Sequence, residues 1–175
     1  MFVAFQRACA VLVAVMLTAC ASGVTRMDSD LKESMPLERN VSSVTLRLSD
    51  EAKKLVADNL KFNQETLKGT IERSMNAQNL VQPGSKQTLE VEITSFRVRS
   101  AFTAVMFGFM AGNDNVEGVV TLKRADGSVA KKAKVSASYA LGGLAGGQDE
   151  SRMSWLYEEF AKLTVAELTG TPIKK

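Results

Sequence analysis

The chain has two residues that could form covalent bonds through sulfur, Cys9 and Cys20, and it contains no histidine. A serine or cysteine nucleophile needs a neighbouring base, and histidine most often supplies it. Without histidine, Ser-His and Cys-His pairs, histidine general bases and His-ligated zinc are all excluded. We therefore expect a protein that is not an enzyme, with no catalytic residue, no metal site and no cofactor.

Cys20 closes an apolar stretch near the N-terminus, in the tetrapeptide Leu17-Thr18-Ala19-Cys20. Arg7 precedes the stretch, and residues 8–17 carry no charge. A positive start, a short apolar run and small residues before the cut are typical of a secretory signal peptide. A transmembrane helix needs roughly 20 apolar residues, and this run falls short.

The tetrapeptide that ends at Cys20 resembles the lipobox of bacterial lipoproteins. The resemblance implies cleavage between Ala19 and Cys20, a diacylglyceryl thioether on Cys20, and acylation of its new amino group with a fatty acid such as palmitate. The alternative is an ordinary signal peptide beside a chance cysteine. Lipoproteins that stay in the inner membrane typically have Asp after the cysteine, where this chain has Ala21 and Ser22. The resemblance thus implies a lipid anchor on the periplasmic face of the outer membrane.

The remaining sequence predicts one domain. Residues 1–19 are the expected signal peptide, 20–40 a lipidated tether of mixed polar composition, 41–170 a periplasmic domain and 171–175 a tail. The net charge of +3 gives no electrostatic case for binding nucleic acid. Once Cys9 is removed and Cys20 is modified, no thiol remains for a disulfide.

Within the domain, alternating apolar residues predict strands at 41–48, 89–98, 116–123 and 129–141. A change of parity after Ile93 indicates a bulge near Ser95. Asp126-Gly127 predicts a two-residue hairpin loop that pairs Val116 with Ala137 and puts the apolar residues of both strands on one face. The other face of this sheet is expected to be wet.

Two stretches with helical spacing complete the domain. An amphipathic helix of about 28 residues is predicted to follow Ser49, and a second helix runs to Gly170. The order β-α-β-β-β-α predicts an α/β (α+β) two-layer sandwich, with a mixed four-stranded sheet and both helices on one face. The aromatic residues of the last helix, Trp155, Tyr157 and Phe160, are expected in its core.

Residues 101–112 are uncharged and form the most hydrophobic part of the expected mature chain. Such a segment is too apolar for an ordinary surface loop. It could be core, a contact with another protein, or an insertion into a membrane. The residues of this candidate interaction loop are Phe102, Val105, Met106, Phe107, Phe109 and Met110.

Charged residues surround this loop and the glycine-rich stretch 141–147, which lacks the pattern of a nucleotide-binding loop. Because polar groups at the ends of strands and helices are normally solvated, we expect these to be solvated too. They are Arg97, Arg99, Asp114, Asp149, Glu150 and Arg152. The lysines near the hairpin are likewise expected on a solvated face, with lipid head groups as the alternative.

The stretches 96–99, 107–112 and 116–122, the Asp126-Gly127 turn and Gly142-Gly143 resemble an uncharacterised family of small proteobacterial lipoproteins with a domain of unknown function. The resemblance implies an envelope location and no known activity. Two functions fit the sequence. The first is a non-catalytic, lipid-anchored protein that binds another envelope protein or forms a homo-oligomer. The second is a membrane-active or oligomer-forming subunit that inserts residues 101–112 into a bilayer.

Overall fold

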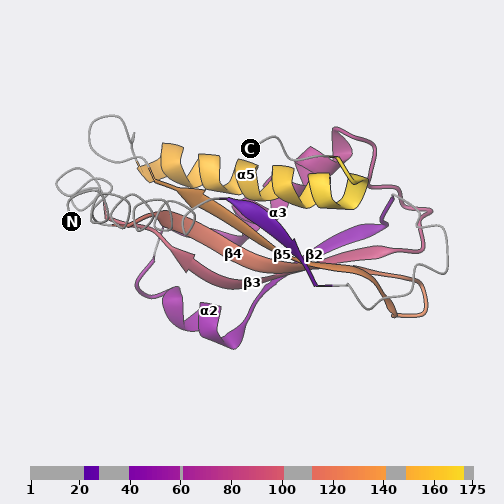
Figure 1. The fold of residues 1–175 in the computed structure, drawn as a ribbon, viewed down its shortest axis with the longest axis horizontal. Coiled ribbons are helices and arrows are strands. Elements are labelled where there is room, and N and C mark those ends of the chain that lie inside the picture. The colour runs from indigo at the N-terminus through magenta and orange to yellow at the C-terminus, as the bar shows by residue number, and fades with distance from the viewer. Residues whose placement is uncertain (1–21, 28–39, 60, 101–111, 141–148, 172–175) are drawn as a thin grey trace, which may run out of the picture.

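A computed structural model describes residues 22–27, 40–59, 61–100, 112–140 and 149–171. Five strands form one sheet in the order β1-β5-β4-β3-β2 (Figure 1). The pair β2–β3 is parallel and the other pairs are antiparallel, so the predicted mixed sheet is confirmed, with one strand more than expected. The strands are β1 Gly23–Arg26, β2 Ser43–Leu48, β3 Thr88–Arg97, β4 Asp114–Lys123 and β5 Val129–Tyr139. The helices are α2 Asp50–Leu55, α3 Gln64–Asn76 and α5 Asp149–Thr169.

The additional strand is β1, which lies in the segment that the sequence predicted as a tether. Gly23–Arg26 pairs antiparallel with β5, and Val24 lies opposite Val135. The backbone N–H of Met27 extends this pairing by donating to the carbonyl of Lys132 (2.8 Å). Four residues give too short an alternating pattern to identify a strand from the sequence.

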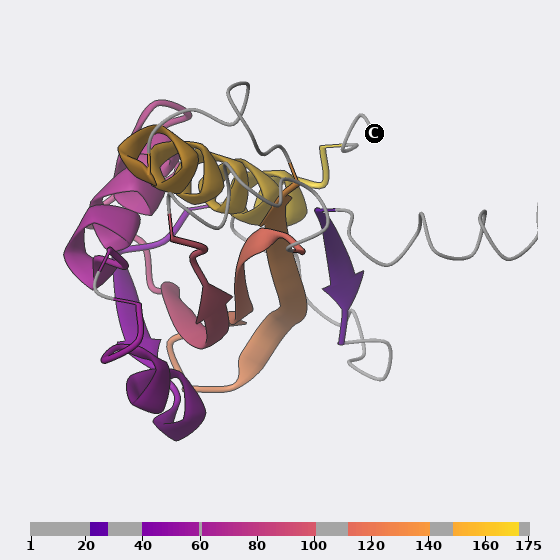
Figure 2. The ribbon, with the colours of Figure 1, turned by 90° about the vertical axis from the view of Figure 1, so that its left-hand side faces the viewer.

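The helices α3 and α5 lie side by side over one face of the sheet, which confirms the two-layer arrangement (Figures 1 and 2). The core between the layers is apolar and includes Leu89, Val91, Ile71, Leu156 and Phe160, all fully buried. Burial of such side chains supplies most of the stability of a domain of this size. The sequence placed these core residues correctly.

The predicted single helix after Ser49 is wrong, because the chain breaks it into α2 and α3. The Asn63 side chain accepts a hydrogen bond from the Thr66 N–H (2.8 Å) and caps the start of α3. Asn59 accepts one from the Val98 N–H (2.9 Å), so its side chain joins the break to the end of β3. Phe62 stacks on Phe96 with 3.9 Å between ring centroids. As a result, α2 lies below the sheet in Figure 1, across from α5.

The bulge near Ser95 is confirmed, since the register of β3 against β4 shifts between Ile93 and Ser95. The predicted register of the β4–β5 hairpin is also confirmed, with Val116 opposite Ala137. Its loop differs in detail. The Gly127 N–H donates to the Arg124 carbonyl (3.0 Å) and Gly127 has φ 82°, which makes a three-residue loop followed by a bulge.

Gly118 permits a close approach of α5 to the sheet. A Cβ at this position would lie 2.8 Å from the Glu92 carbonyl oxygen and 3.1 Å from Cζ of Phe160. A glycine inside a strand often marks such a contact.

Two aromatic residues of α5 have different surroundings. Tyr157 is buried, and this burial raises the pKa of its hydroxyl to about 12, although the hydroxyl accepts a hydrogen bond from the Asn63 N–H. Trp155 differs from the prediction, since it is 40% exposed and packs beside Tyr139.

The opposite face of the sheet carries ion pairs between neighbouring strands. Glu92 pairs with Arg47 (3.0 Å), and two further pairs are Glu90–Lys123 and Glu117–Lys134, each at 2.7 Å. These side chains are partly exposed, so the predicted wet face is confirmed. Two lysines of the hairpin, Lys123 and Lys134, are therefore paired with acids of the same sheet.

Candidate functional site

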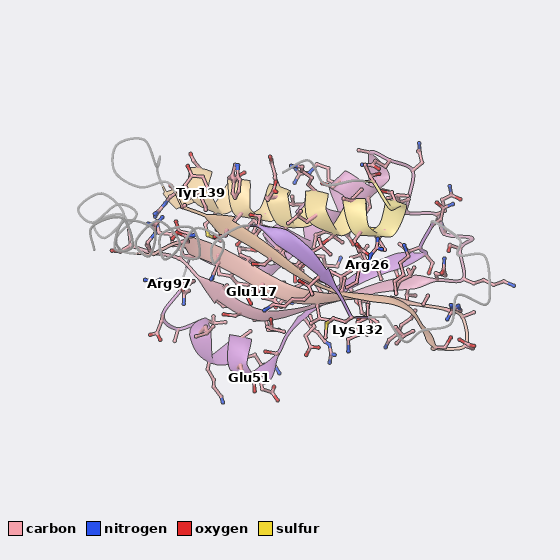
Figure 3. The ribbon with its side chains drawn as sticks, viewed as in Figure 1. Arg26, Glu51, Arg97, Glu117, Lys132 and Tyr139 are labelled. Carbon is pink, nitrogen blue, oxygen red and sulfur yellow. The ribbon has the colours of Figure 1, made fainter. Side chains whose placement is uncertain are left out.

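Four segment ends meet at one end of the sheet, which we call the loop end. They are the end of β3 with residues 97–100, the start of β4 with residues 112–115, the end of β5 with residues 138–140, and the start of α5. Arg97 and Tyr139 mark the loop end in Figure 3. The two uncharged segments of the sequence, 101–111 and 141–148, both begin and finish at these ends.

Three charged side chains form a buried cluster at the loop end, which we call the ion triad: Arg99, Asp114 and Arg152. All three side chains have an exposed fraction of 0%. Nη2 of Arg99 lies 3.2 Å from Oδ2 of Asp114, and Nη1 of Arg152 lies 3.1 Å from the same oxygen. Oδ1 of Asp114 accepts hydrogen bonds from the Arg99 backbone N–H (2.7 Å) and from its Nε (3.2 Å). The prediction that these residues are solvated is wrong.

The ion triad joins all four segment ends. Arg99 precedes residues 101–111 and Asp114 follows them. Nη2 of Arg99 donates to the Tyr139 carbonyl (3.4 Å), which precedes residues 141–148. Arg152 follows residues 141–148, and its Nη2 donates to the Arg99 carbonyl (3.0 Å). Because charge-assisted hydrogen bonds are about twice as strong as neutral ones, the triad fixes the spacing of the two loop bases.

The ion triad stabilises the fold and is not accessible for catalysis. Both oxygens of Asp114 already accept hydrogen bonds from the guanidinium group of Arg99, and the carboxylate has no exposed surface. A general base must reach the proton that it removes, and Asp114 is closed to a substrate. The triad is thus suited to holding the four segment ends together and not to proton transfer.

Gly112 sets the return of the chain into β4. Its φ of 80° lies in the left-handed region that favours glycine. A Cβ at Gly112 would also lie 2.7 Å from Nη1 of Arg97. The sequence pointed to Gly112 only as part of an apolar segment, whereas the structure gives it a backbone role.

The start of β1 is fastened to the same end of the sheet. The Ser22 hydroxyl accepts a hydrogen bond from the Ser138 N–H (2.9 Å) and donates to the Ser138 carbonyl (3.3 Å). Nδ2 of Asn113 in turn donates to the Ser138 hydroxyl (3.0 Å). Ser22, two residues after Cys20 in the sequence, therefore lies close to the start of β4 and the end of β5.

The residues that the sequence singled out for lipidation and interaction lie outside the described residues. These are Ala19, Cys20, Phe102, Val105, Met106, Phe107, Phe109 and Met110. Sequence reasoning named Ser22 only as a residue that follows Cys20. It missed Asn113 and Ser138, which no local pattern marks. It found the members of the ion triad as charges flanking the two uncharged segments, but it assigned them to solvent.

Among the described residues, no cluster of three or more acidic or thiol side chains could hold a metal ion. No helix in the same part of the chain has the length and apolar character needed to cross a bilayer.

A family described as "Domain of unknown function (DUF4410)" matches residues 16–143, well over half of the chain. The chain belongs to this family. The matched range of DUF4410 includes the tetrapeptide Leu17–Cys20, residues 101–111 and the β4–β5 hairpin. No curated protein matches the chain.

Several solved structures have a similar arrangement of elements. One is a PelC dodecamer from Paraburkholderia phytofirmans, with 12% identity over 83% of this chain and 96% of that chain and a TM-score of 0.48. Another is a minor lipoprotein from Acinetobacter baumannii, with 8% identity over 77% of this chain and 94% of that chain and a TM-score of 0.45.

Proposed function

We propose that this member of the DUF4410 family is a non-catalytic, lipid-anchored protein of the cell envelope. Cys20 carries the lipid on the periplasmic face of the outer membrane, and the loop end binds another envelope component or a second copy of the chain. The observation that carries the proposal is the pair of hydrogen bonds between Ser22 and Ser138. They attach the expected anchor to the end of the domain where the uncharged segment 101–111 begins.

Two properties of the described residues support a binding role over catalysis. The one cluster of fully buried charges that the structure describes is closed to substrate and holds loop bases together. The exposed ion pairs on the wet face join neighbouring strands, where acids and bases neutralise each other. Neither arrangement provides a reactive group in a cleft, which a general acid–base mechanism requires.

Replacing Cys20 with serine is expected to abolish the anchor. The variant should lose palmitate labelling and should be either uncleaved or released from the membrane. Three acyl chains contribute about 0.8 kcal/mol per buried CH₂, so release of the native protein should be negligible. Metabolic labelling and sucrose-gradient fractionation measure both effects. A Cys20→Ser protein that still labels, or a native protein that fractionates with inner-membrane markers, would contradict the proposal.

A second candidate is a membrane-active subunit that inserts residues 101–112 into the bilayer. The specific observation in its favour is again the position of Ser22, because an anchor beside the loop base brings the loop to the membrane. Under both candidates the apolar loop residues serve a contact outside the domain, so they need not stabilise its core.

The double variant Phe107→Asp with Phe109→Asp is expected to fold with a nearly native thermal midpoint while it loses its crosslinked complexes or its membrane contact. Two carboxylates in an apolar interface carry a large desolvation cost, whereas exposed ones do not. Val56→Asp is a matched control, since it adds a carboxylate at an apolar residue that is 39% exposed. Unfolding of the double variant would assign the segment to the core instead. A variant that folds and keeps every complex would exclude both candidate functions.

A further inference from the structure

The attachment of β1 to the sheet leaves little freedom between the proposed lipid and the domain. Ala21 alone separates Cys20 from Ser22. Since one residue spans at most about 3.6 Å, the Cα of Cys20 lies within about 7 Å of the Cα of Ser22. Ser22 is itself held by two hydrogen bonds to Ser138 at the loop end.

The far end of β1 is also held, so the strand cannot swing away as a unit. Nε of Arg26 lies 2.8 Å from Oε1 of Glu167 on α5. The Met27 N–H donates to the Lys132 carbonyl. An anchor attached to this strand is therefore attached to the sheet and not to a free tether.

We propose that the loop end is a membrane-contacting surface that lies against the phospholipid leaflet holding Cys20, with the β4–β5 turn pointing away from it. This orientation rests on the proposed lipid anchor. Strands of about ten residues at 3.4 Å per residue place the turn roughly 34 Å from the loop end. In this orientation the loop end contacts lipid, whereas the β4–β5 turn is exposed to the aqueous phase.

The basic residues of the β4–β5 turn do not favour the opposite orientation. Lys123 pairs with Glu90, and Nζ of Lys131 donates to the Glu167 carbonyl (3.3 Å). Nη1 of Arg124 donates to the Val129 carbonyl (3.0 Å). Contact of this turn with anionic head groups would have to replace these interactions. An orientation with the loop end at the membrane leaves these interactions of the turn intact.

The orientation can be measured with the mature lipidated protein in phosphatidylethanolamine–phosphatidylglycerol vesicles that contain spin-labelled lipid as a quencher. Ser100→Cys places a single thiol-linked fluorophore at the loop end, and Ala125→Cys places one in the β4–β5 turn. Both positions are exposed. Removal of Cys9 with the signal peptide and the thioether on Cys20 leave the introduced cysteine as the reactive thiol. We expect quenching at position 100 to exceed quenching at position 125 several-fold.

A twelve-residue Gly/Ser insertion between Ala21 and Ser22 is the matched control. Such a linker has a root-mean-square length of about 19 Å, so the difference between the two positions should shrink while the protein still floats with vesicles. Equal quenching without the insertion, or stronger quenching at position 125, would overturn the orientation. The orientation would also be overturned if position 100 showed no quenching in vesicles and became inaccessible to solvent only when a second protein was bound. Failure of the lipid anchor itself is distinguishable, because that protein would not float with vesicles at all.

Discussion

Replacing Asp114 with asparagine is expected to destabilise the domain by about 3–5 kcal/mol, the usual cost of removing one partner of a buried ion pair. Asparagine keeps the size of the side chain and an oxygen that can accept the hydrogen bond from the Arg99 N–H. It removes the negative charge that faces the guanidinium groups of Arg99 and Arg152, both fully buried. Urea unfolding followed by circular dichroism measures the loss.

Two variants serve as controls for Asp114→Asn. Glu92→Gln removes an acid from the partly exposed pair with Arg47, and such pairs contribute about 0–1 kcal/mol. Arg152→Met leaves the neutral Arg99–Asp114 pair in place, so it should cost less than Asp114→Asn. If Asp114→Asn and Glu92→Gln shift the unfolding midpoint equally, the ion triad does not hold the loop bases.

Local patterns in the sequence were sufficient for most of the sheet. The alternation of Leu89, Val91 and Ile93 indicates which face is buried, and the shift to Phe96 indicates the bulge. In the hairpin, the turn residues and the apolar pattern agree on one register, because a slip by one residue would move every side chain to the other face. Such information is contained within a few consecutive residues.

The break between α2 and α3 depends on contacts with distant residues. Phe62 is an apolar residue within the stretch predicted as one helix, but its ring stacks on Phe96, which lies on β3. Asn59 and Asn63 are weak helix formers that can occur inside a helix, so their presence does not by itself identify a cap. The helix is interrupted where the Asn59 side chain accepts a hydrogen bond from the Val98 N–H at the end of β3.

The ion triad could not be derived for a similar reason. Arg99, Asp114 and Arg152 are recognisable in the sequence as charges that flank two uncharged segments. Isolated charges at element ends are nearly always exposed, and only the fold shows that these three meet and are buried together. Likewise, β1 is stabilised by pairing with β5, and its four residues carry almost no signal of their own.

Replacing Val120 with aspartate is expected to cost at least about 4 kcal/mol, because the new carboxylate would be buried without a partner. Val120 is 3% exposed and lies between Val91 and Ala133 in the sheet, beneath the layer of α3 and α5. The variant should therefore fail to accumulate as a folded protein, or should unfold at a much lower urea concentration.

The matched control is Val119→Asp, the same substitution one residue earlier on the wet face. Val119 is half-buried there and lies opposite Glu92 on one side and Lys134 on the other, so a carboxylate meets one like and one opposite charge in contact with water. Its expected cost is about 1 kcal/mol or less, in line with surface substitutions. Thermal melts that place the two variants together would mean that the two faces of the sheet have been assigned wrongly. A gap of several kcal/mol, with Val120→Asp the less stable, is the result that the packing of α3 and α5 over this face requires.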